Sequence, residues 1–328
     1  MEQVLRLGRR GAELRPFCRS AGVRHQACSG RLQRVLVDFG AEHSFAGAVA
    51  RVREHYRIEV PRETVRKHTL RHGRAINPVA LAGQSASTLI VEMDGSMIPV
   101  MQPGSGSDAR QGKKLFWREA RLCMARAADR AQGLYGATLG SAQTAGWLWR
   151  EVALAGGLSP QTRVHGLGDG AEWILEQFKE NFQEQGGYLL DFYHVSEYLG
   201  AAALKVARPG KEQAWRRRQQ ERLLNGQLPK VLRSLETHLE SPELSETPVR
   251  NAYQYLKRRR EHLDYKAARS KSLPIGSGEI ESGHRHVIQQ RLKLAGCWWK
   301  ETNAQALLNL RVARANGLWE QHWSAARN

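Results

Sequence analysis

Residues 87–100 read STLIVEMDGSMIPV, and this stretch decides the fold class of the chain. It is rich in β-branched and apolar residues, which favour a strand, and an Asp-Gly pair interrupts it as a turn signal. Two further strand candidates follow, LFWREARLCMARA at 115–127 and LYGATLG at 134–140. The chain therefore enters a sheet at Ser87, and we expect Asp94 to close the first strand.

Helices and strands alternate after these three candidates. Residues 141–157 and 171–182 read as helices, and the intervening 162–170 as a strand. The segment GGYLLDFYHVSEYLG at 186–200 passes from strand into helix. Alternation predicts a mixed α/β architecture. Three strands followed by helix, strand, helix and strand is also the element order of a ribonuclease H-like fold.

Residues from about 196 to 270 are almost purely helical in pattern and very basic. Arginine runs lie beside apolar positions in AWRRRQQERLLNG (214–226) and AYQYLKRRREHLDYKAARSK (252–271). A helical insertion inside the α/β domain explains this best. A single charge run is often only a solvated helix face, but several of them favour contact with a DNA backbone.

Three short helices are predicted ahead of the sheet, the second with Ser44 as its N-cap and the third with Pro61 at its start and Gly73 at its end. They resemble a helix-turn-helix module whose recognition helix would carry Arg62, Arg66 and Lys67. Plain three-helix packing with a solvated basic face is the alternative. The predicted organisation is an irregular N-terminal arm (1–30), a helical DNA-binding module (31–75), a linker (76–87) and a catalytic domain (88–328) with the insertion at about 196–270.

Composition points to a polyanionic partner. The 328 residues include 50 Lys and Arg against 32 Asp and Glu, so the formal charge is 50 − 32 = +18. Neutralising phosphates releases condensed counterions, so nucleic acid is the leading candidate. The alternative is a basic protein whose charge only keeps it soluble.

Cysteine usage and the absence of an apolar leader indicate a cytoplasmic protein. Four scattered cysteines, Cys18, Cys28, Cys123 and Cys297, are too few for a disulfide framework. Cys18 and Cys28, with His25 between them, lack the close pairs of a structural zinc site, so zinc is not expected there. No stretch approaches the roughly 20 apolar residues of a membrane span.

Candidate acids follow the strands. Phosphoryl transfer on DNA uses two divalent ions about 3.5–4 Å apart, held by hard oxygen ligands. Asp94 and Asp169 each stand at a predicted strand end before a glycine, although Asp-Gly is also an ordinary turn. Glu92 would share the strand face of Asp94 and is an auxiliary acid or simply solvent-facing.

A third acid comes from LPIGSGEIESGHRHVIQQRLKLAG at 273–296, where a Gly-rich entry leads into a helix. Glu281 lies near the helix start and Glu279 competes with it by position. Either glutamate would also suit the positive end of the helix dipole, which is the purely structural interpretation.

Six stretches together resemble the ISKra family of bacterial insertion-sequence transposases, allied to the Mutator-like superfamily. They are VEMDGSMIPV (91–100), FWREARL (116–122), GDGAEWI (168–174), LLDFYHVSEYL (189–199), LPIGSGEIES (273–282) and QRLKLAGCWWKETNAQALLNLRVARANGLWEQHW (290–323). The resemblance spans roughly residues 88–323. Where relatives often carry a Cys-Lys pair this chain has SGHRH, in which His284, Arg285 and His286 are candidates for DNA contact. No Cys-rich module is found ahead of the helices.

The resemblance implies a DDE catalytic triad of Asp94, Asp169 and Glu281, which would bind two Mg²⁺ ions (or Mn²⁺). It selects Glu281 over Glu279 as the third acid. It also implies a supporting Asp-x-x-His pair, Asp191 and His194, in which Asp191 would orient His194. The implied activity is a transposase that cleaves one strand at each transposon end and joins the freed 3′-hydroxyl to target DNA.

The implied partners are the terminal inverted repeats and target DNA, bound by a homodimer or higher assembly near the nucleoid. Expected DNA contacts are Arg62, Arg66, Lys67, Arg216, Arg217, Arg218, Arg258, Arg259, Arg285 and Arg291. The alternatives are a ribonuclease H-like nuclease or resolvase without strand transfer, and a non-catalytic DNA-binding relic acting as a repressor.

Overall fold

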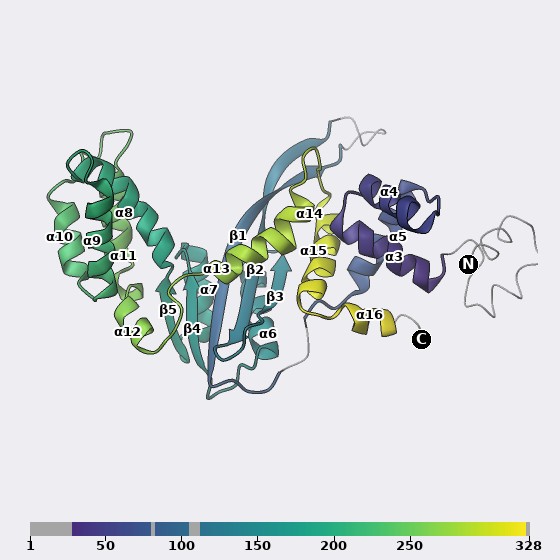
Figure 1. Cartoon of the computed structure of the whole chain (residues 1–328), viewed down its shortest axis with the longest axis horizontal. Coiled ribbons are helices and arrows are strands. Elements are labelled where there is room, and N and C mark those ends of the chain that lie inside the picture. The colour runs from purple at the N-terminus through teal and green to yellow at the C-terminus, as the bar shows by residue number, and fades with distance from the viewer. Residues whose placement is uncertain (1–27, 80–82, 105–111, 326–328) are drawn as a thin grey trace, which may run out of the picture. The chain divides into compact units, whose positions relative to one another are not determined.

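The computed structural model describes residues 28–79, 83–104 and 112–325 (Figure 1). The predicted N-terminal arm lies outside these ranges up to residue 27, and so do Cys18 and His25. The chain divides into two compact units. The first, here called the helical unit, consists of the described residues within 1–78, 97–118 and 285–328. The second, here called the sheet unit, consists of the described residues within 79–96 and 119–284. This grouping differs from the predicted boundary at residue 88.

A five-stranded mixed sheet carries the order β3-β2-β1-β4-β5. Its strands are β1 (Thr88–Gln102), β2 (Lys114–Ala127), β3 (Leu134–Thr138), β4 (Arg163–Gly168) and β5 (Gly186–Leu190). β1 pairs in parallel with β4, and β4 with β5, whereas β2 and β3 are antiparallel. With α6 (Ala142–Ala155) after β3 and α7 (Glu172–Phe182) after β4, the predicted element order is confirmed.

The predicted turn at Asp94-Gly95 is wrong. β1 runs without a break from Thr88 to Gln102, so Asp94 lies within the strand. A Cβ at Gly95 would meet the carboxylate of Glu119 on β2, a flexible side chain that lies over this glycine.

Helices α6 and α7 cover one face of the sheet. Gly136 of β3 leaves room for α6, and Gly166 of β4 leaves room for the ring of Phe178 on α7. The fully buried Trp149 of α6 packs against Phe178 and donates its indole N–H to the carbonyl of Met124 at 3.2 Å. Because Val91 pairs with Gly166, alternate residues of β1 face this layer and the others face away from it.

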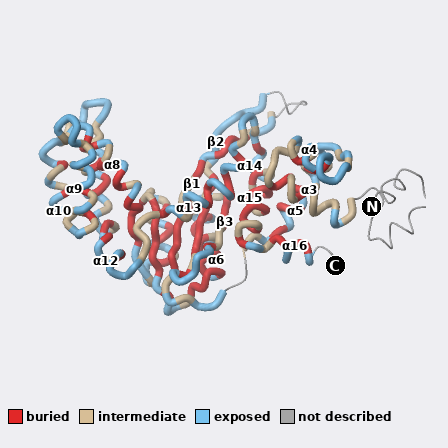
Figure 2. Tube along the Cα trace, in the orientation of Figure 1, coloured by how far each residue is buried: buried red, intermediate tan, exposed pale blue. Residues whose placement is uncertain are grey.

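The predicted helical insertion is confirmed as secondary structure. It consists of α8 (Phe192–Val206), α9 (Glu212–Leu224), α10 (Leu228–Glu236), α11 (Pro248–Arg258), the short 3₁₀ helix η2 (Arg260–His262) and α12 (Tyr265–Ser270). Buried side chains such as Leu223, Val231 and Leu256 join the same core as the strands. Figure 2 shows the strands largely buried while α9 and α10 present exposed outer surfaces.

The helical unit is built on α3 (Gly30–Glu42), α4 (Phe45–Tyr56) and α5 (Arg62–Ala75), with α14 (Gln290–Leu292), α15 (Glu301–Ala315) and α16 (Trp319–Ala325). Leu36, Val52 and Val65 form the core of the three N-terminal helices. Ser44 caps α4 as predicted, its hydroxyl accepting the N–H of Gly47 at 3.0 Å, and Pro61 directly precedes α5.

The prediction that Gly73 ends its helix is wrong, since α5 continues to Ala75. Gly73 instead lets α5 approach α15, because a Cβ there would strike the carbonyl of Ala306. The side-chain amide of Asn309 then donates to the carbonyl of Gly73 at 3.0 Å. A glycine chosen for close packing looks identical in sequence to a glycine chosen for a helix end.

His72 of α5 makes the helical unit sensitive to acid. It is 8% exposed, and its Nδ1 lies 3.0 Å from Nε2 of His322 on α16. Burial, and secondarily the charges of Arg71, His322 and His68, lower the pKa of His72 to about 4.

We expect protonation of His72 to destabilise the fold as the pH falls. Its folded pKa lies below the ordinary value of 6.5, so its contribution is fully present above pH 6.5 and is lost toward pH 4, by up to about 1.4 kcal/mol per pH unit. Urea unfolding over this window should show that the unfolding free energy of His72→Gln changes less with pH than that of the wild type. His238→Gln, which replaces an exposed histidine, should show the same pH dependence as the wild type. An equal pH dependence in all three proteins would contradict the prediction.

No helix in the described ranges is long and apolar enough to cross a membrane. Cys28, Cys123 and Cys297 are free thiols. Burial raises the pKa of Cys123, so this thiol behaves as an apolar core side chain.

Candidate active site

Asp94 and Asp169 lie opposite each other on neighbouring strands. β1 and β4 pair from Thr88 with Arg163 to Glu92 with Leu167. The same register carried two residues further places Asp94 opposite Asp169, which directly follows β4. Neighbouring strands are only about 4.8 Å apart, so these aspartates are neighbours at the carboxyl end of β4, where ligands gather in α/β proteins.

The junction that carries Asp169 is held by α11. Oδ1 of Asp169 accepts the N–H of Ala171 at 2.8 Å, and Gly170 adopts a positive φ of 74°. The hydroxyl of Tyr255 donates to the carbonyl of Asp169 at 2.5 Å, and Nε of Arg259 donates to that of Gly170 at 2.8 Å. The helical insertion therefore fixes the backbone that directly follows this carboxylate.

The short helix α13 (Gly278–Gly283) lies along the face of β1 that carries Asp94. Two residues on that face contact two positions one helical turn apart. Oε2 of Glu92 accepts the N–H of Ile280 at 2.8 Å, and Oδ2 of Asp94 lies 3.1 Å from Nε2 of His284. This face is opposite the α6–α7 layer, because residue 92 alternates with Val91.

His284 is buried against Asp94, with 5% of its side chain exposed. Its approach is a close contact and not a directed hydrogen bond, and neither ring nitrogen has a hydrogen-bond partner among the described residues. It is the first residue of a π-helical turn, η3 (His284–Gln289). Such turns often occur at functional sites. DNA contact by this histidine, as considered from the sequence, does not fit its burial.

Glu92 is not the solvent-facing residue considered from the sequence. It is 1% exposed, and burial raises its pKa to about 8, a rise to which the charges of Glu279 and Asp191 add and which the Ile280 N–H and Arg126 oppose. Burial therefore disfavours the charged form of this carboxyl. Because its Oε2 accepts the N–H of Ile280, Glu92 anchors α13 to β1.

Glu279 and Glu281 occupy opposite flanks of α13. Successive helical residues are about 100° apart, so with Ile280 facing β1 the two glutamates point to either side of it. Glu279 faces β2, because its Oε1 accepts from Nε of Arg126 on that strand at 2.5 Å. Gly283, on the same flank as Glu279, packs against side chains of β2 and β3.

The flank of Glu281 consequently faces the β4 side of β1, where Asp169 lies. Its side chain is exposed and no ion pair of Glu281 is found among the described residues. Glu279 in contrast is engaged by Arg126. This geometry favours Glu281 as the glutamate available to the two aspartates, the choice that the family resemblance implied.

Asp191 acts as a clamp on the backbone. Oδ1 accepts the backbone N–H of His194 at 2.8 Å, which caps α8, and Oδ2 accepts from the N–H and hydroxyl of Ser277 at 2.5 and 2.6 Å. Asp191 thus ties the start of α8 to the Gly-rich entry of α13. It does not orient the imidazole of His194, which instead lies against the rings of Tyr198 and Tyr255.

Removing this clamp should destabilise the protein. Asp191→Ala would leave the N–H groups of His194 and Ser277 without their acceptor in a buried place, at a cost of about 3 kcal/mol. Urea unfolding measures the loss, and Asp191→Asn should recover part of it. Glu197→Ala is the control, because that carboxylate is 78% exposed. A loss no larger than that of Glu197→Ala would refute the clamp.

Two further side chains near the aspartates carry no recognisable sequence signal. Glu119 of β2 occupies the space over Gly95 and pairs with Arg121 at 2.6 Å. Tyr188 of β5 is fully buried; burial raises its pKa well above the ordinary value, and the charges of Asp169 and Asp94 raise it further. Strand residues of this kind show their position only once the strands are paired.

The carboxylate chemistry of the site fits a hard divalent cation. Asp94 and Asp169 offer neighbouring oxygens, and Glu281 is on the flank that faces them. No three His, Cys, Asp or Glu side chains converge as a ready-made metal cluster within the described ranges. Movement of the exposed Glu281 side chain is the change that would add the third donor.

The basic residues expected to bind DNA divide by exposure. Arg62, Lys67, Arg216, Arg217, Arg218, Arg258 and Arg285 are exposed, and Arg66 is half-buried in an ion pair with Glu63. Arg259 holds the Gly170 carbonyl. Arg291 is 1% exposed, donates to the carbonyl of Gly40 at 3.1 Å and lies over the rings of Phe45 and Trp299. Arg291 is therefore a core residue, and its expected DNA contact does not fit its position.

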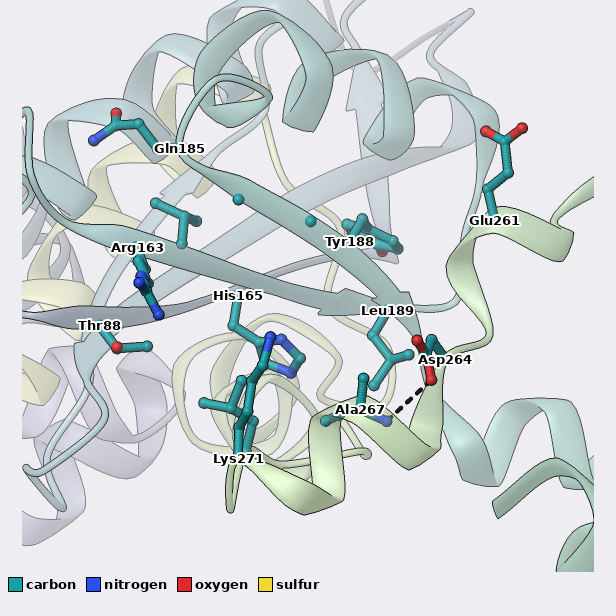
Figure 3. A pocket seen from close by; sticks show the side chains of 15 residues that line it. Thr88, Arg163, His165, Gln185, Tyr188, Leu189, Glu261, Asp264, Ala267 and Lys271 are labelled. Atoms are coloured by element: carbon teal, nitrogen blue, oxygen red, sulfur yellow. Dashed lines mark hydrogen bonds between the residues drawn. The ribbon is translucent and has the colours of Figure 1, made fainter. Parts of the chain in front are cut away.

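A hollow of about 660 Å³ lies at the other end of β4 (Figure 3). Arg163 and His165 from the start of β4 line it with Lys271, and Oδ1 of Asp264 caps α12 through the N–H of Ala267 at 3.0 Å. His165 is already engaged by the carbonyl of Pro274 at 2.8 Å. The hollow is thus separated from the aspartates by the length of the strand.

The fold and these acids define an α/β protein in which an aspartate within β1 lies opposite an aspartate that directly follows β4. The chain belongs to an uncharacterised protein family, UPF0236, which matches residues 22–326. No curated protein matches it. Among solved structures it is similar to one titled "Drosophila P element transposase strand transfer complex", with a TM-score of 0.41 and 9% identity over 96% of this chain and 99% of that one.

Proposed function

We propose that this protein is a DDE-type transposase, a polynucleotidyl transferase that cleaves DNA at transposon ends and joins the freed 3′-hydroxyl to target DNA. One observation carries the proposal above the others. The register of β1 and β4 brings Asp94 opposite Asp169, while α13 turns Glu281 toward the same strand. Two aspartates far apart in sequence are thus neighbours, and Glu281 lies on the flank of α13 on their side, which supports a carboxylate site for phosphoryl transfer.

The finer fold assignment is part of this proposal. The element order, with two parallel strand pairs beside an antiparallel pair, supports a ribonuclease H-like catalytic core. The packing of α3, α4 and α5 around Leu36, Val52 and Val65 supports a helix-turn-helix-like module. In that module α5 would be the helix that contacts DNA.

Asp94, Asp169 and Glu281 are the residues that would hold Mg²⁺ or Mn²⁺. When bound, two such ions polarise the attacking oxygen and stabilise the leaving oxygen. The protein's own contribution is positional: Tyr255 and Arg259 fix the Asp169 junction, and Glu92 anchors α13 through the N–H of Ile280. His284 fills the space beside Asp94 and keeps water from that side of the carboxylate.

The charge of +18 supports double-stranded DNA as the partner. The exposed arginines of α9 and α11 would contact its phosphates, and they stand on the same unit as the acids. Two transposon ends must be held together for transfer, so a homodimer or higher assembly on DNA is part of the proposal.

An assay with labelled end DNA and a plasmid target tests the function. A transposase gives Mg²⁺-dependent cleavage products and then products joined to the plasmid. Cleavage without joining would replace it by the ribonuclease H-like nuclease or resolvase. Binding of end DNA without cleavage, in Mg²⁺ and in Mn²⁺, would replace it by a non-catalytic DNA-binding relic.

A further inference from the structure

Two exposed tryptophans of the helical unit, Trp117 and Trp298, form what is here called the tryptophan platform. Trp117 is 58% and Trp298 41% exposed, and their ring centroids are 6.4 Å apart at an angle of 55°. Both have ordered backbones, because Trp117 belongs to β2 and the neighbour of Trp298 is bonded to β1. The N–H of Met101 donates to the carbonyl of Trp299 at 2.7 Å.

The fold does not need the exposed ring of Trp298. Its neighbour Trp299 is 7% exposed, donates its indole N–H to the carbonyl of Leu292 at 3.0 Å and packs against Phe45. Further apolar side chains are exposed on the same unit, Met97 by 46%, Leu115 by 46% and Phe116 by 38%. The exposed and mutually packed rings of Trp117 and Trp298 are the feature of this unit that indicates a binding surface.

A hollow of about 560 Å³ adjoins the platform and is basic. Trp298, Arg62, Arg66 and Lys300 line it. Among the described residues that line it the acid is Glu63, which forms an ion pair with Arg66 at 2.5 Å. Arg62 and Lys300 form no ion pair within the part of the chain that the structure describes, so two positive charges are left facing a hollow beside an aromatic ring.

We propose that the platform and this hollow bind unpaired nucleotides of a DNA strand, with bases stacked on Trp117 and Trp298 and phosphates beside Arg62 and Lys300. Aromatic rings in a positively charged groove are the chemistry of single-strand binding, since every base offers a face for stacking. Paired bases keep those faces covered within the duplex. A volume of several hundred Å³ suits a nucleotide-sized ligand. The site lies on the helical unit and is distinct from the acids of the proposed activity.

Fluorescence anisotropy with the full-length protein tests the site. The probes are a fluorescein-labelled oligo(dT), an oligo(U) and a duplex of equal length. Trp298→Ala and Trp117→Ala should each weaken oligo(dT) binding roughly tenfold and leave duplex binding within about twofold. Trp298→Phe should retain most of the affinity. Trp147→Ala is the matched control, because that tryptophan is 61% exposed on α6 of the sheet unit, and it should bind as the wild type does.

Equal loss of oligo(dT) and duplex binding would overturn the proposal, as would wild-type affinity in both platform variants. Tighter binding of oligo(U) by tenfold or more would replace DNA by RNA as the ligand. A second experiment cross-links DNA that contains 5-iododeoxyuridine to the wild-type protein by light, so its result does not depend on whether a variant folds. Its cross-linked peptides should contain Trp117 or Trp298, and cross-links found only elsewhere would refute the site. Asp169→Asn, which should bind oligo(dT) normally, separates this result from the proposed catalysis.

Discussion

Replacing Asp169 with asparagine should lower Mg²⁺-dependent DNA cleavage at least roughly a thousandfold while the fold is kept. The amide oxygen can still accept the N–H of Ala171, so the strand-to-helix junction remains capped. What is lost is a negative charge at the carboxyl end of β4, opposite Asp94. Gel analysis of labelled end DNA, with thermal unfolding in parallel, measures both effects.

Asp264→Asn is the matched control for Asp169→Asn. Asp264 also caps a helix, because its Oδ1 accepts the N–H of Ala267 at 3.0 Å. It lies beside the hollow at the opposite end of β4. It should cleave at the wild-type rate. Unchanged cleavage by Asp169→Asn would remove this residue from the active site and with it the proposed triad.

The two glutamates of α13 should separate activity from stability. Glu281→Gln is expected to reduce cleavage by roughly a thousandfold with little change in unfolding free energy, because this side chain is exposed and forms no ion pair within the described part of the chain. Glu279→Gln should leave cleavage within about threefold. Its unfolding free energy should drop by about 1 kcal/mol, because the half-buried pair with Arg126 is broken.

The reverse outcome is equally informative. Loss of cleavage in Glu279→Gln with normal cleavage in Glu281→Gln would exchange the two roles and contradict the flank geometry of α13. Parallel titration of Mn²⁺ binding by calorimetry supplies a readout apart from catalysis. Glu281→Gln should weaken it, and Glu279→Gln should not.

The order of elements was predictable from the sequence, because buried strands and amphipathic helices each leave a local pattern. The role of individual glycines was not. Gly95 looks like a turn but lies within a strand. Gly73 looks like a helix end but leaves room for the backbone of Ala306. Local sequence carries no record of such neighbours.

The candidate site likewise contains residues that the sequence pattern could indicate and residues whose roles depend on distant contacts. Asp94 and Asp169 could be proposed from the sequence because each follows an apolar strand-like run and precedes a glycine, whereas the choice of Glu281 over Glu279 came from the family resemblance. The burial of Glu92, the clamp by Asp191 on Ser277 and the contact of His284 with Asp94 depend on pairing across many residues. Arg291 shows the same limit: an arginine next to basic residues reads as a surface charge, yet its ring contacts place it in a core.

The tight contact between α5 and α15 has a consequence for synthesis of the chain. Asn309 bonds to Gly73 across 236 residues, so α5 emerges from the ribosome long before its cover exists. Contacts this distant in sequence form late and slow folding. Until then the bare face of α5 is exposed to aggregation and chaperones. A product truncated before α15 would keep that face uncovered, so we expect only the finished chain to yield a stable helical unit.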